Sequence, residues 1–132
     1  MIIKNGLIAD PASQKMFSSD LRIRDGLICE IRAGLTPSEN EEALDAEGLV
    51  IAPGLVDTHV HFRDPGFTYK EDLHTGSLAA AKGGFTSVVC MANTSPVTDS
   101  VPVVNDILAR AETAKIHNYP AAAGSRSLKG EE

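Results

Sequence analysis

Two of the four histidines in this 132-residue chain, His59 and His61, stand one residue apart at the end of an apolar run, in the stretch "GLVDTHVHFRDPG". Residues spaced by two on an extended strand project from the same face, so both imidazoles can converge on one point. Neutral imidazoles are common ligands of Zn²⁺ and similar divalent metals. The pair predicts a metal site; the alternative is that both histidines only make hydrogen bonds within a loop.

Two polar residues near this pair are suited to holding a substrate. Arg63 carries a fork of donors that fits a carboxylate, although a surface ion pair with Asp64 is the alternative. Asn93 and Thr94 lie in "MANTSP", after a second apolar run. The Asn93 amide could contact a polar substrate, or this segment could cap a turn. Arg63 and Asn93 are therefore candidate substrate-binding residues, with both alternatives open.

Other residues of these types are expected to have supporting roles. Asp57 points to the same side as His59 and could orient a ligand histidine. The sequence Asp64-Pro65-Gly66 is typical of a turn and is assigned to loop geometry. His74 lies within a predicted helix and His117 at the start of a predicted strand, so both are expected to be structural or exposed.

The elements that must position these residues alternate between strand and helix after residue 53. Apolar runs at 55–60 and 85–92 predict buried strands, the segment 116–123 predicts a third strand, and segments 70–84 and 99–115 predict helices. Strand and helix in alternation indicate a parallel sheet built from right-handed crossovers. In such a sheet, or in a (β/α) barrel, chemistry gathers at the carboxyl ends of the strands, where the candidate residues fall.

The residues before this point follow a different pattern. Short apolar runs alternate with turn signals, and Asp25-Gly26 separates two runs of period two, which is typical of a β-hairpin. These residues are expected to form a small antiparallel sheet. The polar segment 36–43 is expected to be a solvated loop.

Composition excludes several classes of function. With 42% apolar and 23% charged residues and a net charge of -6, the chain is globular, and its scattered Lys and Arg argue against nucleic acid or an anionic membrane as a partner. Cys29 and Cys90 show no metal-binding or disulfide spacing, so two buried thiols are expected. Neither a signal peptide nor a long apolar span is evident, and we expect a cytoplasmic protein.

The segment from "GLVDTHVHFRDPG" through "KEDLHTGSLAAAKGGFTSVVCMANTSPVTD" resembles the N-terminal part of the bacterial long-chain dihydroorotases, of the amidohydrolase superfamily. The resemblance implies a zinc-dependent cyclic amidase that interconverts N-carbamoyl-L-aspartate and L-dihydroorotate in pyrimidine synthesis. It also implies that His59 and His61 bind zinc, as one or two ions, and that Arg63 and Asn93 bind the substrate carboxylate.

The implied fold is α/β: the N-terminal part of a (β/α)8 TIM barrel of the metal-dependent amidohydrolase type, preceded by strands of a small β-sandwich. Residues 1–52 would supply the sandwich strands, and residues 53–132 the first three β/α units of an incomplete barrel. A complete barrel typically needs about 250 residues. We therefore expect an N-terminal fragment that is inactive alone and that self-associates, aggregates or is stable only against its missing half, because its sheet edge is open. The resemblance implies that the proton-shuttle aspartate lies beyond residue 132.

Three functions stay open at this point. The first is dihydroorotase, either without a protein partner or in a complex with aspartate transcarbamoylase. The second is another cyclic amidase, such as an allantoinase or hydantoinase, or a non-catalytic homologue that binds a transcarbamoylase. The third is an interaction module or partial product without activity. A carboxylate-binding Arg63 favours the first.

Overall fold

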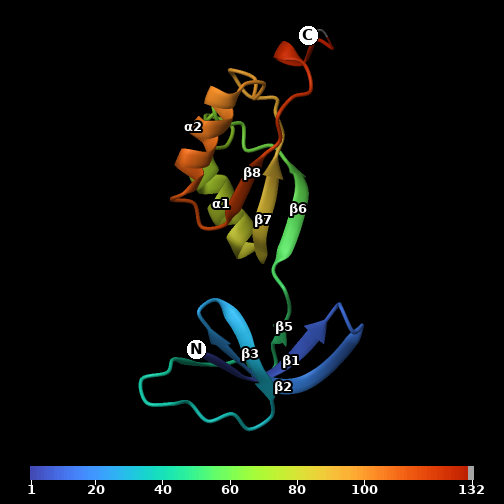
Figure 1. The fold of residues 1–132 in the computed structure, drawn as a ribbon, viewed down its shortest axis with the longest axis vertical. Helices are drawn as coiled ribbons and strands as arrows, with labels where there is room; N and C mark the ends of the chain where they lie inside the picture. The colour runs from blue at the N-terminus through green and yellow to red at the C-terminus, as the bar shows by residue number, and fades with distance from the viewer. Residues whose placement is uncertain (131–132) are drawn as a thin grey trace. The chain divides into compact units, whose positions relative to one another are not determined.

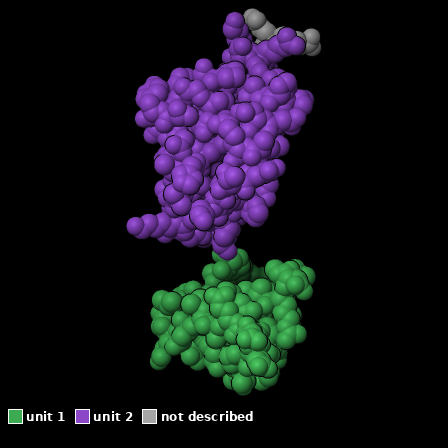
Figure 2. All heavy atoms as spheres, turned by 90° about the vertical axis from the view of Figure 1, so that its left-hand side faces the viewer, with its two compact units in different colours: residues 1–53 green, residues 54–132 purple. Residues whose placement is uncertain are grey.

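The computed structural model describes residues 1–130, and the chain divides into two compact units, Met1–Pro53 and Gly54–Glu132. Figure 2 colours the two units separately. Each is described by itself below. No helix in residues 1–130 combines the length and the apolar character needed to cross a membrane.

The first unit is a five-stranded sheet in which a hairpin is the central feature. Strand β1 (Ile2–Asp10) pairs antiparallel with β2 (Lys15–Arg24), and β2 pairs antiparallel with β3 (Leu27–Arg32). Between β2 and β3, Asp25 and Gly26 have φ angles of 51° and 75°. Two successive positive φ values are the geometry of a primed hairpin turn, so the predicted hairpin is confirmed.

Two short strands make this sheet mixed, so the expectation of a purely antiparallel sheet is wrong. Strands β4 (Ala43–Asp45) and β5 (Val50–Ile51) both run parallel to β1. Parallel pairing needs a crossover connection, and the segment between β3 and β4 supplies it. Arg22 fixes this segment by donating to Glu41 Oε1 at 3.0 Å and to the Thr36 carbonyl at 2.8 Å.

The second unit is a parallel three-stranded sheet in the order β6-β7-β8, with α1 and α2 on one side of it (Figure 1). The predicted alternation of strand and helix is confirmed. The Asp72 carboxylate caps α1 by accepting from Thr75 N at 2.7 Å. The elements of this unit are β6 (Leu55–Val60), α1 (Leu73–Lys82), β7 (Phe85–Cys90), α2 (Val101–Ala111), β8 (His117–Pro120) and the 3-10 turn η1 (Arg126–Leu128).

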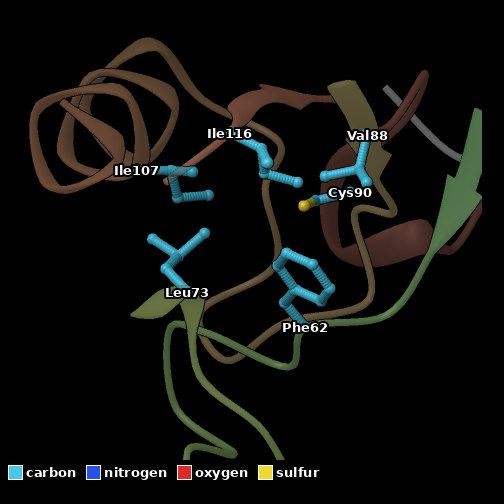
Figure 3. Packing of buried hydrophobic residues seen from close by; sticks show 6 residues of the cluster. All are labelled: Phe62, Leu73, Val88, Cys90, Ile107 and Ile116. Atoms are coloured by element: carbon cyan, nitrogen blue, oxygen red, sulfur yellow. The ribbon is translucent and has the colours of Figure 1, made fainter. Parts of the chain in front are cut away.

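The core of the second unit lies between the sheet and the two helices. Val88 and Cys90 on β7 face Leu73 of α1 and Ile107 of α2, and all four side chains are buried (Figure 3). Phe62, just beyond β6, packs into the same cluster. Burying a residue of this kind contributes about 1.5–3 kcal/mol, so the cluster anchors the end of β6 firmly against the helices.

The face of β6 is more open than the apolar pattern predicted. Leu55 and Val56 are 53% and 60% exposed, so the expectation of a fully buried strand is wrong for this element. Within residues 1–130, β6 lies at the edge of its sheet and pairs with β7 alone. Val60 packs against the core, so alternation along the strand turns Asp57 and His59 to the other face of the sheet.

Candidate functional site

Two loops that follow neighbouring parallel strands are joined side by side. We call residues 61–66 the β6 loop and residues 91–96 the β7 loop. Met91 N donates to Val60 O at 2.9 Å where the strands end, and Ser95 N donates to Pro65 O at 3.0 Å further along. The two backbone hydrogen bonds hold the loops in a fixed register.

Gly66 allows the closest approach between these loops. Its φ is 93°, and a Cβ built on it would collide with the Ser95 carbonyl oxygen. Glycine therefore serves here both for its positive φ and for the space that it leaves. This supports the assignment of the Asp64-Pro65-Gly66 turn to loop geometry.

The two candidate metal ligands lie together at the carboxyl end of β6. The ring centroids of His59 and His61 are 5.2 Å apart, with an angle of 69° between the ring planes. Both residues are exposed. Spacing by two on the strand has brought the imidazoles close, as the sequence predicted.

Asn93 reaches across from the β7 loop to His61. Its Oδ1 lies 2.8 Å from His61 Nδ1. An amide oxygen only accepts hydrogen bonds, so this contact favours the neutral tautomer of His61 that has its proton on Nδ1. The sequence predicted a substrate contact for Asn93 but gave no sign of this contact with a histidine.

Asp57 lies on the same face of the strand as His59, but its hydrogen bond differs from the one expected. Its carboxylate accepts from the backbone N–H of His59 at 3.0 Å, and this contact is to the main chain rather than to an imidazole. The expectation that Asp57 orients a histidine ring is therefore wrong in this structure. An aspartate that accepts a hydrogen bond from the backbone N–H two residues ahead is less available to contact a more distant side chain.

Arg63 is half-buried in the β6 loop and adopts a φ of 61°. Within residues 1–130, the hydrogen bond recorded for this residue is to its backbone, where Phe67 N donates to its carbonyl at 2.8 Å. The Asp64 carboxylate binds Arg110 of α2, and within residues 1–130 Arg63 forms no ion pair with it. The Arg63 guanidinium is thus left for another anion.

Asp64 and Arg110 form a contact that sequence reasoning missed. The Asp64 side chain is 7% exposed, and its second oxygen accepts from Leu73 N at 3.2 Å, at the start of α1. The carboxylate thus ties the β6 loop to both helices. The 46 residues that separate it from Arg110 leave no local sequence signal for the pair.

Thr94, next to Asn93, serves the loop rather than the open face. Its hydroxyl lies 2.7 Å from Pro96 O and 2.9 Å from Thr98 Oγ1, and Thr94 and Thr98 are both buried. Turn formation was one of the alternatives for this segment, and Thr94 takes that role. The network fixes the β7 loop directly after Asn93.

The remaining histidines lie away from the pair. His74 is exposed on α1 and His117 is exposed at the start of β8, as expected. The expectation of two buried thiols is half wrong: Cys90 is buried in the core, but Cys29 on β3 is exposed. Burial raises the pKa of the Cys90 thiol to about 11, with a smaller contribution from Asp64.

The described residues supply two candidate metal ligands rather than a full set. No group of three or more His, Cys, Asp or Glu side chains able to hold a metal occurs in residues 1–130. Two imidazoles bound to one tetrahedral zinc at about 2.1 Å would have ring centroids about 5 Å apart. The 5.2 Å separation of His59 and His61 fits that arrangement.

Known proteins are similar to this chain in both sequence and fold. Curated dihydroorotases of Clostridioides difficile and Citrifermentans bemidjiense are 47% and 46% identical to it over 132 residues, which are 31% of each relative. The chain thus spans about a third of the length of these relatives. Among solved structures, the L-hydantoinase of Arthrobacter aurescens matches 96% of the chain at a TM-score of 0.84 and 26% identity, with 28% of that protein covered.

A D-hydantoinase of Thermus sp. matches 94% of the chain at a TM-score of 0.75 and 27% identity, over 27% of its own length. These likenesses confirm the predicted fold class, the α/β fold of an amidohydrolase barrel in its N-terminal part. The family model described as dihydro-orotase-like matches residues 48–132. The chain therefore belongs to the dihydro-orotase-like family.

Proposed function

We propose that this chain forms part of the active site of a dihydroorotase, which interconverts N-carbamoyl-L-aspartate and L-dihydroorotate. The observation that carries the proposal is the pair of imidazoles 5.2 Å apart at the end of β6, with Arg63 and Asn93 in the two loops beside it. An arginine free to bind an anion, next to a metal-binding pair, suits a substrate that carries a carboxylate.

His59 and His61 would hold zinc, together with ligands that lie outside residues 1–132. A bound metal would polarise the amide carbonyl and lower the pKa of a water molecule. We place the proton-shuttle aspartate beyond residue 132, so residues 1–132 alone should not turn over substrate. Two protein ligands are also fewer than the three that are usual for catalytic zinc.

Arg63 and Asn93 would position the substrate. The guanidinium offers two parallel donors to the carboxylate, and Nδ2 of Asn93 can donate as well, because its Oδ1 is the atom that faces His61. In the hydrolytic direction water attacks the ring amide carbonyl, and the ring C–N bond breaks as its nitrogen takes up a proton. In the synthetic direction the carbamoyl nitrogen closes on the side-chain carboxyl, the C–N bond forms, and one carboxyl oxygen leaves as water.

A hydantoinase-like cyclic amidase is the second candidate. The observation in its favour is the structural likeness to L- and D-hydantoinases, at TM-scores of 0.84 and 0.75. A hydantoin ring lacks the carboxylate that Arg63 would bind. Sequence identity of 47% with curated dihydroorotases, against 26% with the L-hydantoinase, favours the first candidate.

The test is an assay of the protein from its complete reading frame, before and after removal of metal by a chelator. L-Dihydroorotate and a hydantoin without a carboxylate are offered side by side. We expect turnover of dihydroorotate that is lost on chelation and restored by zinc. Faster turnover of the hydantoin would support the second candidate, and no metal-dependent turnover of either would contradict both. A role in pyrimidine synthesis and assembly with a transcarbamoylase stay predictions from the resemblance. A cytoplasmic location stays a prediction from the N-terminal sequence, and self-association one from the open sheet edge.

A further inference from the structure

The contact between His61 and Asn93 lies between two backbone hydrogen bonds that join the same two loops. Val60 O accepts from Met91 N on one side of it, and Pro65 O accepts from Ser95 N on the other, at 2.9 and 3.0 Å. A side-chain contact enclosed by two such bonds has little freedom to shift. The 2.8 Å contact of His61 Nδ1 with Asn93 Oδ1 thus joins two loops whose backbones are held in register on both sides of it.

The β7 loop is fixed just after Asn93 as well. The buried Thr94 hydroxyl bonds to Pro96 O and Thr98 Oγ1, and Thr98 N donates to Ala92 O at 3.0 Å. Asn93 therefore stands between two residues, Ala92 and Thr94, whose positions are determined by buried hydrogen bonds. The backbone position from which the Asn93 side chain extends is therefore fixed.

We propose that Asn93 is a positioning residue for the metal site: it keeps the proton of His61 on Nδ1, and so presents the Nε2 lone pair to the metal. A neutral imidazole in solution exchanges between two tautomers, and one of them has Nε2 protonated and unable to ligate. Partners that fix the tautomer of a ligand histidine typically change metal affinity or activity by 10–100-fold. This inference rests on the proposed function for its metal, but not for the tautomer.

The same amide would serve the substrate through its other atom. Within residues 1–130 the structure records no protein partner for Asn93 Nδ2, while Oδ1 is used by His61. One side chain would then couple metal binding to substrate binding. Replacement by aspartate separates the two functions, because a carboxylate keeps the acceptor and loses the donor.

The tautomer is tested first, in the protein from the complete reading frame, labelled with ¹⁵N at histidine and freed of metal, at pH 8. Two- and three-bond ¹H–¹⁵N correlations of each imidazole show which nitrogen carries the proton. We expect His61 to be protonated on Nδ1 in the wild type and in Asn93→Asp, and to shift toward the Nε2-protonated form in Asn93→Ala. The exposed His74 and His117 are internal references, and Asn105→Ala on the exposed side of α2 is the matched control.

Zinc affinity is tested second, by competition with a chromophoric chelator in the protein from the complete reading frame. We expect Asn93→Ala to weaken zinc binding by about 10–100-fold, while Asn93→Asp and Asn105→Ala stay within about threefold of wild type. Asn93→Asp should still raise the KM for dihydroorotate. An unchanged His61 tautomer and unchanged zinc affinity in Asn93→Ala would overturn the inference and leave the proposed function standing. A wild type that binds no zinc would overturn the proposed function, and the spectra would still report the tautomer.

Discussion

The two sheets of this molecule use their charged side chains in opposite ways. In the first unit, the charges that lie close to the sheet are paired within the fold. The buried Asp20 accepts from the backbone N–H groups of Asn5 and Leu35, both at 2.8 Å, and the Asn5 contact holds the pKa of this carboxyl below its ordinary value. Arg22 pairs with Glu41 at 3.0 Å.

At the carboxyl ends of β6 and β7, by contrast, several polar side chains lie close together without being fully hydrogen-bonded within residues 1–130. Within residues 1–130, Arg63 and His59 make hydrogen bonds through their backbone atoms. The Asp64–Arg110 pair fixes the β6 loop against α2. Parallel strands end at one edge, so their loops collect side chains there, whereas hairpins spread them along both edges. The donors and imidazoles left free in the described residues are the basis of the proposed site.

The strongest test of this contrast removes His61. In the protein from the complete reading frame, His61→Ala should lower bound zinc and reduce turnover by more than the roughly 100-fold typical of losing a residue that only orients a ligand. Because His61 is exposed, its free energy of unfolding should change by less than about 0.5 kcal/mol. Metal analysis, steady-state kinetics and urea unfolding measure the three quantities. His74→Ala is the control; zinc and turnover at wild-type level in His61→Ala would contradict ligation.

Loss of the guanidinium of Arg63 should affect binding of the substrate and spare the metal. Arg63→Met should lower kcat/KM for dihydroorotate by roughly 100-fold, about 2.7 kcal/mol, since a charge-assisted bidentate contact is removed. A hydantoin without a carboxylate should be much less affected. Arg24→Met, an exposed arginine of the first unit, serves as the control. Equal losses for both substrates would show that Arg63 is structural.

Gly26 and Gly66 both have positive φ, but only Gly66 lies against another loop. Substituting each by alanine therefore distinguishes the cost of the backbone conformation from the cost of a steric clash. A methyl group added to Gly26 in the first unit would point into open space, whereas one added to Gly66 would meet the Ser95 carbonyl. Gly66→Ala should therefore lower the free energy of unfolding by about 2.5 kcal/mol and Gly26→Ala by about 1 kcal/mol, as measured in urea. Equal costs would mean that the loops can separate without penalty.

The buried carboxylate of Asp64 should contribute more to the free energy of unfolding than the exposed carboxylate of Asp106, which pairs with the same arginine. Asp64 and Asp106 both bind Arg110, with side chains 7% and 57% exposed. Asp64→Asn should lower the free energy of unfolding by about 2 kcal/mol, less than for a fully buried pair because Arg110 is itself 39% exposed. Asp106→Asn should cost about 0.3–0.5 kcal/mol. Similar values for the two variants would contradict the role given to Asp64.

The smallest expected effect on stability comes from the two cysteine thiols, which should differ mainly in their reactivity. At pH 8 a chromogenic disulfide reagent should react quickly with the exposed Cys29 and slowly with Cys90, whose pKa of about 11 leaves about one thousandth of it as thiolate. A pKa raised in the folded state contributes stability below the ordinary thiol pKa, so stability should fall as pH rises from about 9 towards 11. Cys29→Ser should remove the fast phase. Two fast thiols would show that the core of the second unit opens readily.

Several features followed from the sequence because they depend on local geometry. The hairpin at Asp25-Gly26 needed two residues that tolerate positive φ, and the order of strand and helix after residue 53 followed from periodicity and glycine stops. The proximity of His59 and His61 followed from the alternation of side chains along a strand. Each of these is fixed by residues only a few positions apart.

Only the tertiary structure decided which distant groups meet. The contact of His61 with Asn93 spans 32 residues, and that of Asp64 with Arg110 spans 46. Such pairs depend on how β6, β7 and α2 pack, which no local pattern specifies. The parallel course of β4 and β5 beside β1 likewise depended on the crossover that Arg22 holds, and the side chain of Asp57 turned to its own backbone. Sequence therefore determined which residues could do chemistry here, and packing determined which of them remain free to do it.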